Sequence, residues 1–329
     1  MIAQRARSWA VVLAAGEGSR LHGLTRNSRG VVVPKQFCSL QGGPSLLQEA
    51  IQRSLAVAPL QRVCTVVAAQ HRHWWQRMLS YLPEQNIIAQ PHNRGTAHGI
   101  LLPLLRIAAQ DPDAVVMFLP SDHYIADEGV FAAALRQAAT LASMDESSLY
   151  LLGTEPDQAD PELGYIVPTS RSREVPSPVL RFVEKPTPDA AMALLEQGGL
   201  WNVFVLAASV RTLLGLFRET LPGTLDAMEH LNGHAMENMY RNLPTVDFSR
   251  DILQGREERL QVICVPQCGW TDLGTPPRVA STLQRLEEIR VGPARRANPS
   301  VHLNLAAQYE WLQQRAAAEP SFARSDSRA

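Results

Sequence analysis

The sequence predicts an α/β protein built on a Rossmann-like, mainly parallel mixed sheet with helices on both faces. Through the first half of the 329-residue chain, apolar runs of strand length alternate with helix-like stretches, as in a parallel sheet covered on both faces. The first apolar run, 11–15, leads into a loop with two glycines, Gly16 and Gly18. This length is enough for one large domain or two modest ones.

The first half divides into five strands and four helices. Short apolar runs predict strands at 9–15, 63–69, 86–89, 114–119 and 149–153. Apolar residues at helical spacing predict helices at 44–57, 73–82, 97–109 and 128–143, the first opening at Pro44 and Ser45.

After Gly153 the pattern changes to that of an α+β lobe. Strands are expected at 164–168, 179–184, 200–207 and 260–265. Helices are expected at 189–197, 209–221 and 276–290, with helical pieces over 223–242. We expect this lobe to extend the same sheet. Residues 291–329 are expected to form a linker, one more helix over 306–318 and a disordered polar tail.

Charge and cysteine usage exclude several classes of function. The formal net charge is −1, which argues against nucleic acid or an acidic membrane as the main partner. No run approaches the ~20 apolar residues of a membrane span. The four cysteines are sparse and scattered, which fits reduced thiols in a cytoplasmic protein. A short signal peptide over 1–15 is the alternative. Oligomeric state, including a homo-oligomer, stays open.

The glycine loop is the first candidate site. Backbone N–H groups freed by Gly16 and Gly18, flanked by Arg20 and Lys35, can surround a polyphosphate. Pro34 fixes the backbone just before the lysine and so aims its cation. A dinucleotide fingerprint would need a third glycine where Leu21 stands, and a Walker A loop would need Gly-Lys-Ser/Thr. A plain strand-to-helix turn remains the alternative.

Two aspartates follow predicted strands. Asp122 follows the apolar run 115–119, and Asp272 follows the last strand. Ligands collect beyond the carboxyl ends of strands in an open parallel sheet, so both carboxylates can share Mg²⁺. Each aspartate could instead cap the following turn or helix. Zinc is not favoured at Cys264 and Cys268, which have no second pair.

Two further segments suit a base and a sugar. In the segment 90–97, Gly95 would let a flat ring approach the backbone and Thr96 could bond its edge, unless Thr96 is only a helix cap. Glu184 could accept hydrogen bonds from sugar hydroxyls, and Lys185 could neutralise a monophosphate. Gly164, Tyr165 and Asn202 offer a close backbone, an aromatic wall and an amide, while Trp201 could be core.

Together these motifs resemble the sugar nucleotidyltransferase family over roughly residues 9–290. The motifs that carry the resemblance are the glycine loop with Arg20, Pro34-Lys35, Asp122, Glu184-Lys185-Pro186 and Asp272. Residues 34–37, 93–97 and 120–123 resemble the mannose-1-phosphate guanylyltransferase branch. The chain departs from the family pattern at His22-Gly23, in a longer loop over 26–33 and at Val203-Phe204.

The resemblance implies a domain over 1–290, with a nucleotide-binding half at 9–155 and a sugar-binding half at 156–290. It implies a nucleotide-diphospho-sugar transferase fold and Mg²⁺-dependent attack of a sugar 1-phosphate, most simply mannose 1-phosphate, on the α-phosphate of GTP. The implied catalytic residues are Arg20, Lys35, Asp122, Lys185 and Asp272, with Asp122 and Asp272 on the metal. The implied nucleotide contacts are Leu13, Ala14, Ala15, Gly16, Glu17, Gly18, Ser19, Arg20, Gln90, Gly95 and Thr96. The implied sugar contacts are Gly164, Tyr165, Glu184, Lys185 and Asn202.

Two alternatives stay open. The changed segment 201–204 is compatible with uridylyl or thymidylyl transfer to glucose 1-phosphate. The departures and the tail are also compatible with a non-catalytic regulatory subunit that binds a nucleotide sugar. The partners expected in each case are small molecules.

Overall fold

The computed structural model describes residues 8–291 except 27–29, 41, 171, 173–174 and 231–232. The expected linker, last helix and tail at 292–329 lie outside these residues. Within the described part the strands are β1 (Ser8–Ala14), β2 (Val63–Ala68), β3 (Ile87–Gln90), β4 (Val115–Pro120), β5 (Leu149–Thr154), β6 (Tyr165–Pro168), β7 (Ser177–Val183), β8 (Leu200–Ser209) and β9 (Leu260–Val265). They form one nine-stranded sheet in the order β3-β2-β1-β4-β8-β5-β9-β7-β6, and β6 also pairs with β8.

The sheet is mixed, as predicted. β1 pairs in parallel with β2 and β4, β2 with β3, and β5 with β9. β8 is antiparallel to β4, β5 and β6, and β7 is antiparallel to β6 and β9. β7 and β8 therefore run against the common direction of the other described strands. The order was not predicted, because β8 enters between β4 and β5 from far along the sequence.

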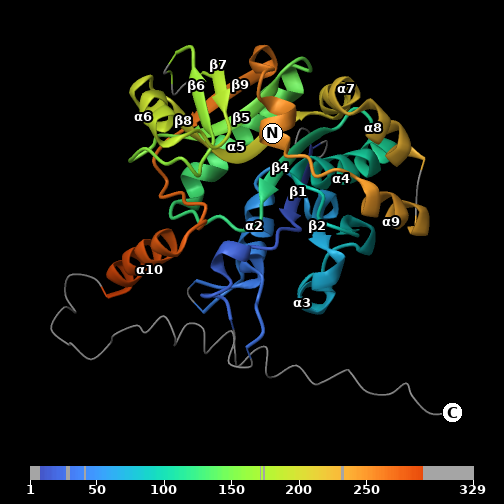
Figure 1. Ribbon diagram of the computed structural model, residues 1–329, viewed down its shortest axis with the longest axis horizontal. Helices are drawn as coiled ribbons and strands as arrows, with labels where there is room; N and C mark the ends of the chain where they lie inside the picture. Colours follow the sequence, from blue (N-terminus) through green and yellow to red (C-terminus); the bar gives the residue numbers. More distant parts are fainter. Residues whose placement is uncertain are drawn as a thin grey trace.

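Helices cover both faces of the sheet (Figure 1). They are α2 (Leu46–Ser54), α3 (Arg72–Met78), α4 (Thr96–Gln110), α5 (Glu128–Met144), α6 (Pro188–Glu196), α7 (Val210–Thr220), α8 (Pro222–Glu229), α9 (Gly233–Asn242) and α10 (Pro276–Val291). The sequence predicted helical structure at each of these positions, although α3 ends at Met78 rather than near residue 82. It missed the π-helical turn Phe248–Leu253.

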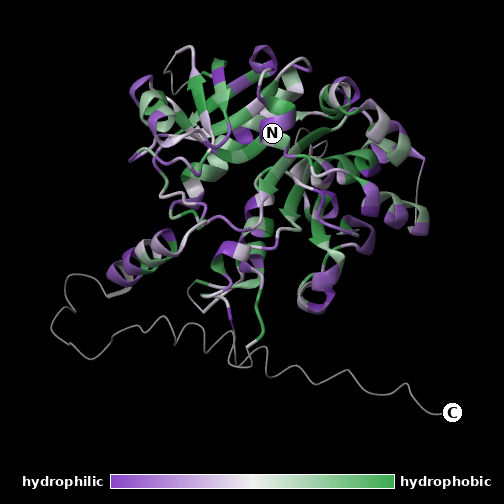
Figure 2. Cartoon of the chain, viewed as in Figure 1, coloured by the Kyte–Doolittle hydropathy of each residue, from purple (hydrophilic) through white to green (hydrophobic). Residues whose placement is uncertain are grey.

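Alternation along β1 separates two hydrophobic cores. Trp9 and Val11 pack with α4, α7 and α8 on one face, whereas Ala10 and Val12 pack with α2, α3 and α5 on the other. Successive side chains of a strand point to opposite faces, so a strand buried on both sides reads as a continuous apolar run. Figure 2 shows hydrophobic residues along these central strands and more polar residues on the outlying helices.

Local signals explain where several helices begin. Ser45 and Gln48 form a reciprocal capping box at α2, and the Ser209 side chain caps α7. Thr187 caps α6, which has proline in its first turn. No helix within the described ranges is long and apolar enough to span a membrane.

Candidate active site

A cavity of about 480 Å³ opens at the carboxyl ends of β1, β3 and β4. The helix after β1 (α2) packs on one face of the sheet and the helix before β4 (α4) on the other, so β1 lies at a topological switch point, where ligands bind in such sheets. The cavity is lined by Leu13, Ala15, Gly16, Gln36, Val66, Gln90, Asn93, Gly95, Thr96, Gly99, Pro120, Ser121, Asp122, His123, Glu184, Lys185, Phe204, Thr245, Asp247 and Ser249.

The glycine loop reaches this cavity in part. Of the nucleotide contacts predicted in β1 and this loop, three line the cavity, namely Leu13, Ala15 and Gly16. The other predicted loop contacts are not among its lining residues, namely Ala14, Glu17, Gly18, Ser19 and Arg20. Gly16 has no heavy atom within 4 Å of the place where a side chain would start, so its backbone is open to a ligand.

Gln36 holds the loop from beneath. Its amide nitrogen donates to the carbonyl oxygens of Ala14 and Gly16, both at 2.9 Å, and only 2% of the residue is exposed. Gly18 has φ +61°, and a Cβ there would lie 3.2 Å from the Cβ of Lys35. The loop and the 34–37 motif therefore pack as one unit. Sequence reasoning quoted Gln36 as part of the motif but gave it no role.

Lys35 joins the two predicted metal ligands. Its ammonium nitrogen lies 2.9 Å from Oδ2 of Asp122, and it donates to the main-chain oxygens of Asp272 at 2.6 Å and Leu273 at 3.3 Å. The lysine is 8% exposed. An antiparallel bridge between Tyr124 and Thr271 holds the segments after β4 and β9 together. The structure thus brings Lys35, Asp122 and the Asp272 backbone to one place.

His123 lies beside Asp122 and also feels the charge of Asp272. The indole nitrogen of Trp270 donates to its Nδ1 at 3.2 Å, and its Nε2 lies 3.9 Å from Oδ1 of Asp122. An indole nitrogen only donates, so Nδ1 is unprotonated and the imidazole proton is on Nε2. Burial lowers the pKa of His123 to about 4, against the opposing field of Asp122. The imidazole is therefore neutral at pH 7.

The carboxylate of Asp272 is held by a second basic residue. Its Oδ1 accepts from Nη1 of Arg278 at 2.6 Å and from the backbone of Gly274 at 3.0 Å. Arg278 also pairs with Asp160. Asp272 lies outside the residues that line the large cavity and lines a neighbouring cavity of about 190 Å³. The predicted metal pair is thus adjacent through Lys35 and His123, while the two carboxylates border different hollows.

These two carboxylates fit Mg²⁺ in their chemistry. Burial alone would raise the pKa of Asp122, but the charge and hydrogen bond of Lys35 together with His123 outweigh it and hold that pKa below its usual value. Burial would also raise the pKa of Asp272, but His123, Arg278 and the backbone of Gly274 together outweigh it and lower that pKa. Ionised oxygen ligands suit Mg²⁺, which is usually bound by one or two carboxylates plus substrate phosphates. The described residues contain no cluster of three or more metal-ligating side chains.

Arg20 is not among the residues that line the large cavity. It lies in the short turn Ser19–Leu21 and forms an ion pair with Glu162, in which both side chains are about half exposed. An exposed pair of this kind contributes little to stability, so it can be exchanged for another anion at small cost.

The predicted base segment is tied to a distant one. A Cβ at Gly95, which has φ +87°, would lie 2.1 Å from the carbonyl oxygen of Val246. Glycine is therefore required here by the neighbouring backbone. Thr96 does not cap its helix: its hydroxyl accepts from the backbone of Phe248 at 2.7 Å. Gln90 is 3% exposed, and its amide nitrogen has no hydrogen-bond partner among the described residues.

The segment after α9 supplies three lining residues that sequence reasoning missed. Thr245, Asp247 and Ser249 border the cavity. The Ser249 hydroxyl is buried and finds no hydrogen-bond partner in the described part of the chain. These polar residues stand at every second position, a spacing that could have indicated a shared face, but the sequence analysis assigned the segment to no helix or strand.

Three of the predicted sugar contacts come together. A Cβ at Gly164 would lie 2.5 Å from Oε2 of Glu184 and 3.4 Å from the Cβ of Asn202. The backbone of Asn202 donates to the oxygen of Gly164 at 2.8 Å. A side chain at Gly164 would therefore displace the Glu184 carboxylate from this place.

Glu184 lies in an environment that disfavours its charge. Burial and the nearby Asp247 raise its pKa to about 7, against the opposing effects of Lys185 and Arg250. The ammonium of Lys185 lies 3.8 Å from its Oε1, and the Lys185 side chain is 44% exposed. A half-ionised carboxyl beside a cation can accept or donate hydrogen bonds.

Tyr165 corrects the sequence prediction. It is 0% exposed and packs against Ala191 and Leu194, while its hydroxyl accepts from the backbone of Asp160 at 2.7 Å. The ring is therefore part of the core and cannot form a wall against a sugar. Trp201 is core as well, being 9% exposed.

Backbone strain concentrates at the site. Among the described residues, the non-glycines with positive φ are Lys185 (49°), Phe204 (55°) and Leu273 (49°). Lys185 and Phe204 line the cavity, and the oxygen of Leu273 accepts from Lys35. Phe204 falls where β8 slips register against β5. Such conformations cost about 1–3 kcal/mol each and cluster at functional sites.

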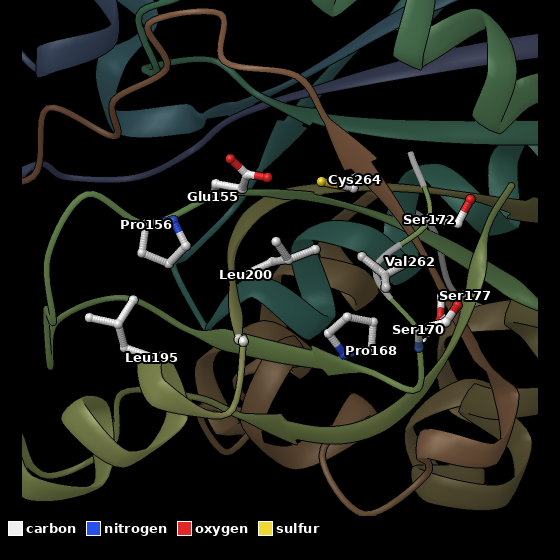
Figure 3. Close-up of a pocket in the computed structure, with 12 residues that line it drawn as sticks. Glu155, Pro156, Pro168, Ser170, Ser172, Ser177, Leu195, Leu200, Val262 and Cys264 are labelled. Carbon is white, nitrogen blue, oxygen red and sulfur yellow. Dashed lines mark hydrogen bonds between the residues drawn. The ribbon is translucent and has the colours of Figure 1, made fainter. Parts of the chain in front are cut away.

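A third hollow lies elsewhere on the sheet. It has about 240 Å³, and Figure 3 shows Leu200, Val262 and Pro168 around it, with Ser170 and Ser177 at one side. The two serines hydrogen-bond to each other at 3.2 Å. This hollow shares no lining residue with the large cavity.

Comparison with known proteins gives consistent matches. A family model described as nucleotidyl transferase matches residues 9–288. A mannose-1-phosphate guanylyltransferase from Escherichia coli is 30% identical over 290 residues, covering 82% of this chain and 59% of that protein. The alginate biosynthesis protein AlgA from Pseudomonas aeruginosa is 34% identical over 208 residues, covering 60% of this chain and 41% of that protein. The chain thus spans 41 to 59% of the length of these relatives.

Solved structures agree in fold. A crystal structure described as mannose-1-phosphate geranyltransferase from Thermus thermophilus superimposes with a TM-score of 0.71 at 28% identity, covering 82% of this chain and 76% of that one. A UDP-glucose pyrophosphorylase gives a TM-score of 0.58 at 15% identity, covering 86% of this chain and 99% of that one, and so supports the fold alone.

Proposed function

The chain belongs to the nucleotidyl transferase family, and from that premise we propose that it condenses a nucleoside triphosphate with a sugar 1-phosphate. We propose GTP and mannose 1-phosphate as the substrates, since relatives named for that pair match this chain at about 30% identity. The observation that carries the proposal is the contact of Lys35 with both Asp122 and the Asp272 backbone, beside a cavity lined from both halves of the chain.

In the proposed reaction a phosphate oxygen of the sugar 1-phosphate attacks the α-phosphorus in line. A new P–O bond forms, the bond to the β-phosphate breaks, and pyrophosphate leaves with the electron pair. No protein nucleophile is needed, so catalysis consists of placement and charge compensation. Asp122 and Asp272 would hold Mg²⁺, which would neutralise phosphate charge when bound.

The other candidate side chains have separate roles in the proposed reaction. Lys35 and Arg20 stabilise the leaving pyrophosphate, and Arg20 exchanges Glu162 for phosphate when the triphosphate binds. Lys185 neutralises the incoming sugar phosphate. Glu184 and Asn202 hold the sugar hydroxyls. Around the base and ribose stand the open backbone at Gly16 and the polar groups of Gln90, Gly95 and Thr96.

The use of lysine supports this assignment. The sequence contains 29 arginines and only two lysines, Lys35 and Lys185. Arginine and lysine are not interchangeable where a compact ammonium is needed. A chain that uses arginine for almost every other cation keeps lysine at the two positions to which the proposal gives phosphate contacts.

We place the enzyme in the cytoplasm, because its four cysteines are free thiols. Its proposed partners are small-molecule substrates, and a homo-oligomer is compatible with the proposal.

The test is a substrate panel read by pyrophosphate release. GTP, ATP, UTP, CTP and dTTP are each paired with mannose 1-phosphate and glucose 1-phosphate, with Mg²⁺ or with EDTA. We expect GTP with mannose 1-phosphate to turn over fastest, EDTA to abolish release, and Asp122→Asn to lower the rate by about two orders of magnitude.

Other outcomes would replace the proposal. Faster turnover of UTP or dTTP with glucose 1-phosphate would assign the other nucleotidyl transfer. Binding of GDP-mannose without pyrophosphate release from any pair would identify a non-catalytic regulator.

A further inference from the structure

Arg278 links two aspartates from different parts of the site. It lies in the first turn of α10, where Nη1 donates to Oδ1 of Asp272 at 2.6 Å and Nη2 donates to Oδ2 of Asp160. The three side chains are only 13 to 17% exposed. Interactions of this kind are screened much less by solvent than the exposed pairs elsewhere on the molecule.

One end of the link fixes the Asp272 carboxylate. Oδ1 receives two donors, Arg278 and the backbone of Gly274, whereas Oδ2 receives no hydrogen bond from a described residue. A Cβ at Gly274 would lie 2.3 Å from Oδ2, so the carboxylate is packed closely against that glycine. Arg278 therefore leaves one oxygen available to a cation while it restricts rotation of the group.

The other end fixes the loop that leads to the sugar contacts. Oδ1 of Asp160 accepts from the backbone of Glu162 at 2.9 Å, and the backbone nitrogen of Asp160 donates to the hydroxyl of Tyr165 at 2.7 Å. Gly164 lies within this short span, against the Glu184 carboxylate. A displacement of this loop by a bound sugar phosphate would be transmitted to Asp160.

The charge of the group also matters. Two carboxylates share one guanidinium, so the cluster carries a net charge of −1. This excess negative charge would attract a divalent cation to the free oxygen of Asp272. Without Arg278 the two acids would face each other unpaired, and the carboxylate could turn away from the site.

We propose that Arg278 is a positioning residue that orients Asp272 for the divalent metal and couples metal affinity to occupancy of the sugar half through Asp160. This inference rests on the proposed function, because it takes Asp272 as a metal ligand. Partners that orient metal ligands are worth about 10- to 100-fold in metal affinity. Coupling between two sites is reciprocal, so sugar phosphate and metal should each tighten the other.

The experiment measures Mn²⁺ binding to the full chain by titration calorimetry and by electron paramagnetic resonance, with and without mannose 1-phosphate. The variants are Arg278→Met, Arg278→Lys and Asp160→Asn. Arg136→Met is the matched control, since Arg136 is an exposed arginine on α5 that lines neither the large cavity nor the neighbouring hollow that contains Asp272 and Arg278. Thermal melting without metal identifies any variant that has lost its fold.

We expect Arg278→Met to weaken Mn²⁺ binding at least tenfold, Arg278→Lys to restore part of it, and Arg136→Met to match the wild type. Asp160→Asn removes the excess negative charge, so it should weaken Mn²⁺ binding less than Arg278→Met does, and it should lose the gain produced by mannose 1-phosphate. Wild-type Mn²⁺ affinity in folded Arg278→Met, or an unchanged gain in Asp160→Asn, would overturn the inference. Pyrophosphate release by the wild type is measured separately, so the proposed function can stand when this inference fails.

Discussion

The ammonium nitrogen of Lys35 lies 2.9 Å from a carboxylate oxygen of Asp122, although the strands β2, β3 and β4 and the helices α2, α3 and α4 separate the two residues in the sequence. The lysine is almost fully buried, and its ammonium also donates to the main-chain oxygens of Asp272 and Leu273. A compact ammonium with three rotatable donors suits this arrangement, and a planar guanidinium does not.

We therefore expect Lys35→Arg to lower kcat/KM by about 100-fold even though the charge is kept. The measurement is pyrophosphate release with GTP and mannose 1-phosphate. The control is Arg259→Lys, an exchange in a surface pair with Glu219. Activity of Lys35→Arg within threefold of the wild type would show that the geometry of the ammonium is not used.

Glu184 should make stability fall as pH rises. Its pKa is raised from 4.5 to about 7 in the folded chain, so the folded state binds more protons between these values than the unfolded state does. The free energy of unfolding should drop over this window, by up to about 3 kcal/mol. Urea unfolding between pH 4 and 8 measures it. Glu184→Gln should flatten the slope, and an equal slope in that variant would assign the effect to another group.

The same carboxyl should shape substrate affinity. As pH rises through about 7, Glu184 ionises and accepts sugar hydroxyls more strongly. The KM for mannose 1-phosphate should therefore fall across this range, and Glu184→Gln should remove the step while the KM for GTP stays constant. A step of the same size in the GTP titration would place the titrating group outside the sugar site.

Two glycines should separate binding from folding. Gly16 has open space where a side chain would start, so Gly16→Ala should keep the melting temperature but raise the KM for GTP at least tenfold. Gly95 has positive φ and faces the Val246 backbone, so Gly95→Ala should cost more than about 2 kcal/mol of stability. Chemical denaturation measures the stability of both variants, and pyrophosphate release at varied GTP gives the KM of Gly16→Ala. Gly43→Ala is the control, because a side chain at Gly43 would also meet open space. Equal stability of the Gly16 and Gly95 variants would contradict this division.

Trp270 should fix the tautomer of His123. Its indole donates to Nδ1, so nitrogen-15 NMR should find the proton on Nε2 and a neutral ring down to about pH 4. Trp270→Phe keeps the ring but removes the donor. That variant should populate the other tautomer and lose about 1 kcal/mol of stability. An unchanged tautomer would mean that Asp122 alone orients the imidazole.

The sequence predicted the elements well because their signals are local. Apolar runs and capping residues lie within each strand or helix, as at Ser45 and Ser209. The insertion of β8 beside β4 is set by pairing across about 90 residues of chain, which no local pattern specifies. Tyr165 was misjudged because β6 is buried on both faces, and alternation gives no outward side in such a strand.

The site was predictable where a residue type and a strand end coincide. Asp122 and Glu184 were proposed in this way, whereas Lys35 was proposed because Pro34 precedes it. Arg278 and Asp160 were not, because their meeting depends on where α10 lies relative to a distant loop. Sequence reasoning also allowed Asp272 to cap a helix, and the structure instead gives its carboxylate to Arg278 and Gly274.

The unequal exposure of the two lysines has a practical consequence. The Lys185 side chain lines the large cavity and is 44% exposed, whereas that of Lys35 is only 9% exposed. Of the two lysine side chains, an acylating reagent would find only Lys185 open, so acylation of lysine would place the label beside the large cavity. Coupling the protein through Lys185 to an amine-reactive resin would block that same cavity, and carboxyl chemistry is the better choice for immobilisation, because none of the four cysteines is exposed.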